Sequence, residues 1–93
     1  MAIKSEISWK RLGTDGKRRE IYARRFGGEW RFHHRERRHD VWQAMPDPPL
    51  EDWLHLLDAL ERRVTRRLST PAELARVLQA IRERHPEYTG NAG

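Results

Sequence analysis

The sequence contains no cysteine among its 93 residues. A disulfide framework, a thiolate zinc site and a cysteine nucleophile are therefore excluded, and the fold must depend on apolar packing. No stretch approaches the roughly 18 apolar residues of a membrane span, and the N-terminal residues lack the apolar segment of a signal peptide. We therefore expect a cytoplasmic protein with no membrane partner.

Residues suited to nucleophilic catalysis are also scarce. The sequence has only three serines, none of them in the glycine-rich context of a nucleophile elbow: Ser5, Ser8 and Ser69. A metal-free ribonuclease would combine an arginine, a histidine and a tyrosine, and His33, Tyr22 and Arg31 are the residues of those types to weigh. A strands-first order of elements does not favour that enzyme class. We expect a protein that is not an enzyme and that uses no cofactor.

Three histidines lie close together in the sequence, at positions 33, 34 and 39. Imidazoles bind zinc, copper and nickel, so this group raises the question of a metal site. Adjacent residues of a strand point to opposite faces, however, so His33 and His34 cannot easily share one ion. Arginines surround them, and we predict no metal site.

The first half of the chain has the pattern of strands separated by turns. Apolar residues alternate with charged ones, and glycines at 13, 16, 27 and 28 supply the backbone freedom of tight hairpins. The pattern predicts three strands over residues 5–12, 17–26 and 29–38. Residues 40–45 favour a fourth strand, although no glycine or proline marks the turn before it.

The second half has the pattern of two helices. Leucines recur at helical spacing with Trp53 over residues 49–68, and Thr70-Pro71-Ala72-Glu73 has the form of a capping box that begins a second helix over residues 71–84. Pro86 ends that helix. The expected fold is α+β, an antiparallel sheet of three or four strands followed by two C-terminal helices that cover one of its faces. We expect one domain over residues 1–86 and a flexible tail over 87–93.

The turns also predict which residues face each other across the sheet. A two-residue turn at Gly27-Gly28 sets Ala23 opposite Phe32 and Glu20 opposite Arg35, and a three-residue turn at 14–16 sets Trp9 opposite Ile21. One sheet face then becomes apolar, with these members: Ile7, Trp9, Ile21, Ala23, Trp30 and Phe32. The other face combines cationic and aromatic side chains: Tyr22, Arg24, Phe26, Arg31, His33 and Arg35.

The basic residues are concentrated in the first half. Residues 1–46 hold 12 Lys+Arg against 6 Asp+Glu, whereas residues 47–93 hold 7 against 8. Such an asymmetry favours a polyanionic partner. We interpret the cationic and aromatic face as a nucleic-acid-binding surface for RNA or DNA, with Arg24, Arg31 and Arg35 contacting phosphates and Tyr22, Phe26 and His33 contacting bases. The alternative is a protein-interaction module that uses the same face, or Trp42 and Leu56.

The helical half offers two other possible nucleic-acid-binding features, and neither is favoured. Arginines at positions 62, 63, 66 and 67 close a helix that acidic residues open, which is the order that complements the helix dipole, and Asp58 is placed to pair with Arg62. A helix-turn-helix would need base-reading residues at the start of the second helix, where the sequence instead has Pro71, Ala72 and Glu73. We therefore place the candidate site on the sheet.

Overall fold

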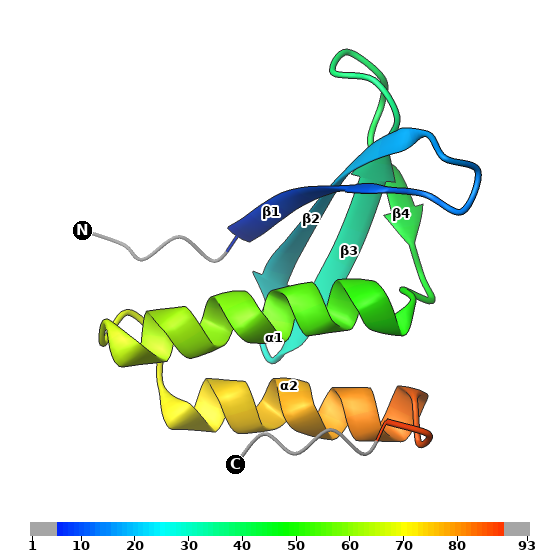
Figure 1. The fold of residues 1–93 in the computed structure, drawn as a ribbon. Helices are drawn as coiled ribbons and strands as arrows, with labels where there is room; N and C mark the ends of the chain where they lie inside the picture. Colours follow the sequence, from blue (N-terminus) through cyan, green and yellow to red (C-terminus); the bar gives the residue numbers. More distant parts are fainter. Residues whose placement is uncertain (1–5, 89–93) are drawn as a thin grey trace. The chain divides into compact units, whose positions relative to one another are not determined.

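The computed structural model describes residues 6–88 and has an α+β fold (Figure 1). Four strands come first and two helices follow: β1 (Glu6–Leu12), β2 (Arg18–Phe26), β3 (Glu29–Arg35), β4 (Gln43–Met45), α1 (Leu50–Thr65) and α2 (Pro71–Arg84). The strands form one antiparallel sheet in the order β1-β2-β3-β4. The contacts divide the chain after Pro48 into a sheet unit and a helical unit. The packing of the helices on one sheet face stays a prediction, as does the single domain.

Both predicted hairpin registers are confirmed. The Gly13 N–H donates to the Lys17 carbonyl at 2.7 Å and encloses a three-residue turn, in which Gly16 has a φ of 78°. Gly27 has a φ of 61°, which the first position of a two-residue hairpin turn requires. All three pairs that the turns predict are observed: Trp9–Ile21, Glu20–Arg35 and Ala23–Phe32. The same registers also give the following pairs: Glu6–Arg24, Ile7–Ala23, Lys10–Glu20, Ile21–His34, Arg25–Trp30 and Phe26–Glu29.

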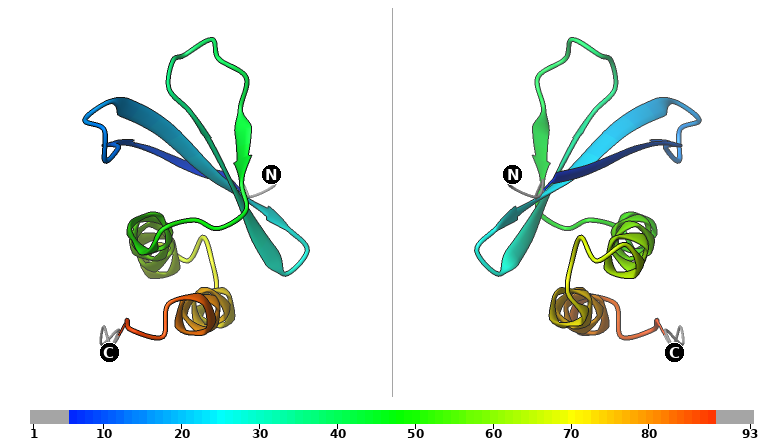
Figure 2. Two further views of the ribbon diagram at one scale, coloured as in Figure 1. Left: turned by 90° about the vertical axis from the view of Figure 1, so that its right-hand side faces the viewer. Right: turned by 90° about the vertical axis from the view of Figure 1, so that its left-hand side faces the viewer.

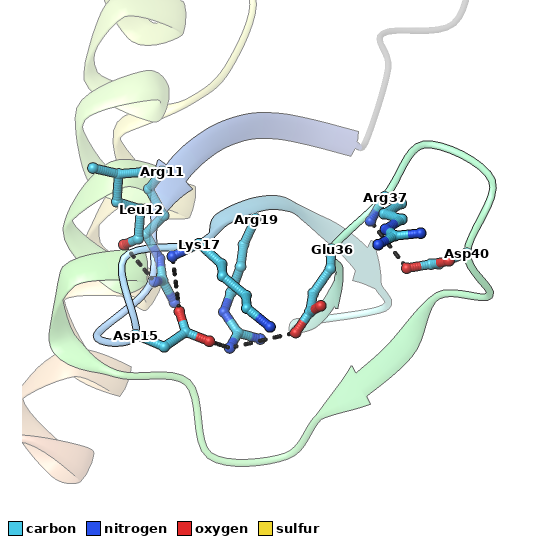
Figure 3. Close-up of polar contacts among 8 residues, drawn as sticks. All are labelled: Arg11, Leu12, Asp15, Lys17, Arg19, Glu36, Arg37 and Asp40. Carbon is cyan, nitrogen blue, oxygen red and sulfur yellow. Dashed lines mark hydrogen bonds and ion pairs between the residues drawn. The ribbon is translucent and has the colours of Figure 1, made fainter.

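Strands β3 and β4 are shorter than predicted. The Arg37 N–H donates to the Asp40 carboxylate at 3.0 Å, and the Asp40 N–H donates to the Arg37 carbonyl at 3.0 Å (Figure 3). The aspartate side chain thus stabilises a turn that contains neither glycine nor proline. This turn ends β3 at Arg35 and delays β4 to Gln43.

The apolar face of the sheet matches its prediction in position. Ile7, Ile21, Ala23 and Phe32 are buried, and Trp9 and Trp30 on the same face are half-buried. The Trp9 and Phe32 rings meet edge to face, with centroids 6.1 Å apart. Because successive side chains of a strand point to opposite faces, the even-numbered residues of β2 lie on the other face of the sheet. The candidate site lies on that face.

The helical unit is an antiparallel pair in which α1 and α2 lie side by side (Figure 2). The buried side chains of both helices are apolar residues at helical spacing, with Asp52 and Glu73 in addition: Trp53, Leu56, Leu57, Leu60, Val77 and Ile81. Leu56 is 0% exposed, so the suggestion that it meets a partner chain was wrong. Its position one residue before Leu57 widens the apolar stripe of α1.

Each end of the helical connection has a defined cap. The Thr70 hydroxyl accepts the Glu73 N–H at 3.2 Å, as the capping box predicts. At the end of α1, the Leu68 N–H donates to the Arg63 carbonyl and the Arg67 N–H to the Val64 carbonyl, which is the Schellman pattern. This cap ends α1 at Thr65, three residues before the predicted end, and leaves Leu68 exposed. After α2, the His85 ring lies 3.2 Å from the Glu87 carboxylate, so the predicted tail begins with a local contact, whereas residues 89–93 lie outside the described residues.

Arg67 occupies the left-handed position of the Schellman cap, with a φ of 61°. A residue with a Cβ is strained there, whereas glycine is not. We expect Arg67→Gly to raise the free energy of unfolding by about 1 kcal/mol, measured by urea denaturation. Arg66→Gly at the preceding position, where φ is −88°, is the control and should be destabilising. An equal effect of the two substitutions would contradict the strain at Arg67.

Candidate polyanion-binding face

The structure places all six predicted site residues on the face of β2 and β3 opposite the buried isoleucines. Three cross-strand pairs define their arrangement: Arg24 lies opposite Arg31, Tyr22 opposite His33, and Glu20 opposite Arg35. Phe26 follows at the hairpin end, opposite Glu29. The six residues divide into two clusters with different surroundings.

The first group, the hairpin-end cluster, consists of Arg24, Phe26 and Arg31. The Arg24 and Arg31 guanidiniums lie 5.4 and 4.9 Å from the centroid of the Phe26 ring, and all three residues are exposed. Two like charges directly opposite each other on neighbouring strands repel, and the contacts with the ring offset part of that cost. In the part of the chain that the structure describes, neither guanidinium forms an ion pair. An added anion would relieve the repulsion.

Carboxylates border this cluster without joining it. Glu6 of β1 lies opposite Arg24, and Glu29 lies opposite Phe26. The attraction for an anion therefore depends on two adjacent guanidiniums and not on a large local excess of charge. Such an arrangement suits a phosphodiester, whose two non-bridging oxygens accept hydrogen bonds from arginine.

The second group, the Trp42 cluster, consists of Glu20, Tyr22, His33, Arg35 and Trp42. The Tyr22 and His33 rings stack with centroids 4.7 Å apart and planes 10° apart, and the Trp42 ring meets Tyr22 edge-on at 4.7 Å. The Arg35 guanidinium lies 4.2 Å from the Trp42 centroid and forms an ion pair with Glu20 at 2.6 Å. Arg35 is therefore neutralised and held in place, in contrast to Arg24 and Arg31.

Trp42 also belongs to this face, where its ring packs on Tyr22 and Arg35. The sequence pattern predicts Trp42 only as a contact for a partner chain. The pairs His34–Gln43 and His33–Ala44, extended by one position, set Trp42 opposite Arg35. Alternation within the predicted strand 40–45 indicates this face, but the register depends on the Asp40 turn, which alternation does not reveal.

The two adjacent histidines lie on opposite faces, as expected. The Nδ1 atoms of His33 and His34 are both buried without a hydrogen-bond partner in the described structure. Across residues 6–88 no group of three potential ligands is arranged to hold a metal ion. His33 contributes to the face as a stacked ring.

Arg19 lies on the face of β2 opposite the site and forms a separate ion-pair chain (Figure 3). Its guanidinium is 3.2 Å from the Asp15 carboxylate and 3.8 Å from that of Glu36. The Lys17 backbone N–H donates to Asp15 and lowers the pKa of that carboxyl, and Arg19 lowers it further. These two ion pairs connect the turn of the first hairpin to Glu36, which follows β3. Arg19 is consequently engaged and is not available to the candidate site.

A further basic surface lies at the end of α1. A shallow recess of about 420 Å³ is lined there by Ala59, Arg62, Arg63, Arg66 and Leu68. Arg62 pairs with Asp58 at 3.1 Å, as predicted, and both side chains are largely exposed. An exposed pair of this kind contributes little to stability. The arrangement agrees with the helix-dipole interpretation.

No model of a known protein family matches this chain, and neither the curated proteins nor the solved structures contain a match to it. Within residues 6–88 no helix is long and apolar enough to cross a membrane.

Proposed function

We propose that this protein binds single-stranded nucleic acid, RNA or DNA, through the hairpin-end cluster. The observation that carries the proposal is the position of Arg24 and Arg31 opposite each other on neighbouring strands, both against the exposed ring of Phe26. The two cations have no carboxylate partner among the described residues and occupy adjacent strands about 5 Å apart. They can neutralise one phosphate together or two successive phosphates separately.

The Phe26 ring supplies the second part of the site. It is 44% exposed, so a base can approach it. Stacking on an aromatic ring requires an unpaired base, because the bases of a duplex are already stacked on each other. A ring flanked by guanidiniums therefore favours a single strand over a duplex.

The Trp42 cluster would serve as a support for this site. The ion pair with Glu20 uses the charge of Arg35, and Tyr22 and His33 stack on each other. We therefore assign smaller direct contributions to Arg35, Tyr22 and His33 than to the hairpin-end cluster. The protein-interaction alternative stays a prediction, and an acidic protein would compete with nucleic acid for the same two arginines.

Phe26→Ala tests the stacking contribution. The substitution is expected to weaken binding of a labelled single strand by about 5- to 150-fold, which corresponds to about 1–3 kcal/mol per stacked base. Binding to a duplex of the same length should change much less. Fluorescence anisotropy at low salt measures both affinities.

The matched control for this prediction is Leu12→Ala. Leu12 is also a large, exposed apolar residue, at 65%, and it lies on the same face of the sheet as Phe26, at the far end of β1. Its substitution should leave single-strand binding unchanged. Equal losses for Phe26→Ala and Leu12→Ala, or no loss for either, would contradict a base stacked on Phe26.

A further inference from the structure

Strand β1 forms an edge of the sheet over its whole length. It pairs with β2 on one side, and within residues 6–88 no strand pairs with its other side (Figure 1). β1 has seven residues, whereas β4 at the opposite edge has three. A long edge strand offers unpaired N–H and C=O groups to another strand, and a three-residue edge offers few.

The hairpin geometry determines which backbone groups of β1 point outward. The Gly13 N–H bonds to Lys17, and hydrogen-bonded pairs alternate with non-bonded pairs along an antiparallel ladder. Trp9 and Ile7 therefore bond to β2. Glu6, Ser8 and Lys10 direct their N–H and C=O groups away from it.

These outward residues are complementary to a second copy of the same strand. A two-fold axis through Ser8 places Ser8 opposite Ser8 of the other copy, Ile7 opposite Trp9, and Glu6 opposite Lys10. Each of the last two pairs occurs twice. The apolar residues meet on the apolar face and the opposite charges meet on the other face, which are favourable cross-strand pairs. We propose that two copies of this protein associate through β1 in this register and form a continuous eight-stranded antiparallel sheet.

Other registers are less favourable. A two-fold axis through Trp9 would set Ile7 opposite Arg11 and Glu6 opposite Leu12, so both opposite-charge pairs are lost. A shift by one residue would set Ile7 opposite Lys10 and mix the two faces of the sheet. Charged residues on edge strands often prevent self-association, but here the two charges lie equally far on either side of Ser8 and attract. Both charge and hydrophobicity thus favour the register that is centred on Ser8 over these two alternatives.

The interface is short, so the expected dimer is weak. It lies at the low end of interface sizes, below about 1,200 Å² of total buried surface. Sedimentation equilibrium of the full chain, with loading concentrations up to about 1 mM, covers affinities down to about −4 kcal/mol. We expect a reversible monomer–dimer equilibrium. A monomer at every concentration would overturn the proposal. So would a dimer whose affinity neither Ser8→Pro nor Lys10→Glu changes.

Ser8→Pro removes one outward N–H and leaves the bonds between β1 and β2 in place, because proline is tolerated where an edge N–H faces solvent. The variant should be monomeric, with a circular dichroism spectrum and thermal midpoint close to those of the wild type. If it fails to fold, the charge exchange decides. Lys10→Glu should weaken the dimer at least tenfold, and Glu6→Lys added to it should restore association. Lys17→Glu, the same charge change in the turn, should have no effect. Failure of the double variant to recover would refute the register.

Discussion

Replacing Trp53 with alanine is expected to lower the free energy of unfolding by about 3–5 kcal/mol, a large part of the stability of a small domain. Trp53 is 3% exposed, and it lies on the same stripe of α1 as Leu57 and Leu60, which are also buried. The Arg84 guanidinium of α2 lies 5.5 Å from its ring centroid. The substitution therefore removes apolar contacts, leaves a cavity and deprives Arg84 of a cation–π partner.

Chemical denaturation of the wild type and the variant measures this effect. Val41→Ala is the control, because Val41 is 83% exposed and its truncation should change stability by within about 0.5 kcal/mol. A loss below about 1 kcal/mol for Trp53→Ala would show that the apolar stripe of α1 does not contribute to a packed core.

The double substitution Arg24→Gln with Arg31→Gln is expected to abolish most nucleic-acid binding without destabilising the protein. Both residues are exposed, and their mutual repulsion is removed, so the free energy of unfolding should stay within about 0.5 kcal/mol per site. If both contact phosphates, the slope of log K against log salt should fall in magnitude by about 1.4–1.8 units. Adding Arg35→Gln should change the slope little further, because Glu20 already neutralises Arg35.

The control for this pair is Arg66→Gln with Arg82→Gln. These residues are exposed on the helical unit, so the variant has the same net charge as the double sheet variant. It should retain both the affinity and the salt slope of the wild type. Equal losses in the two variants would indicate binding through net charge alone, and a loss confined to the helical variant would move the site to the helical unit.

The local parts of the fold could be predicted from the sequence because short-range rules determine them. Glycines at 13, 16, 27 and 28 fixed the turn lengths, and alternation then fixed the register and the two faces, including the Glu20–Arg35 ion pair. The Thr70 cap followed from a four-residue motif in the same way. In contrast, the turn at Asp40 depends on one side chain bonding to the backbone of Arg37, which alternation cannot reveal.

The division of the site into two clusters could not be predicted from the strand pattern. Alternation placed Arg24, Arg31 and Arg35 on one face as equivalents. Their difference arises because Arg35 contacts Glu20 and Trp42, whereas Arg24 and Arg31 lie over the Phe26 ring and form no ion pair among residues 6–88. Trp42 reaches this face through the β3–β4 register, which involves residues beyond the unrecognised turn. Which arginine keeps its charge available is therefore a property of packing and not of the sequence period.

The most direct test of the proposed function is a salt titration of wild-type binding by fluorescence anisotropy. Labelled single-stranded RNA, single-stranded DNA and a duplex of equal length are compared at several salt concentrations. We expect tighter binding of a single strand than of the duplex, and log K should fall linearly as log salt rises. The slope should be at least about 0.7 in magnitude for one neutralised phosphate, and about 1.4–1.8 for two. Absence of binding to all three at low salt, or binding that does not respond to salt, would contradict it.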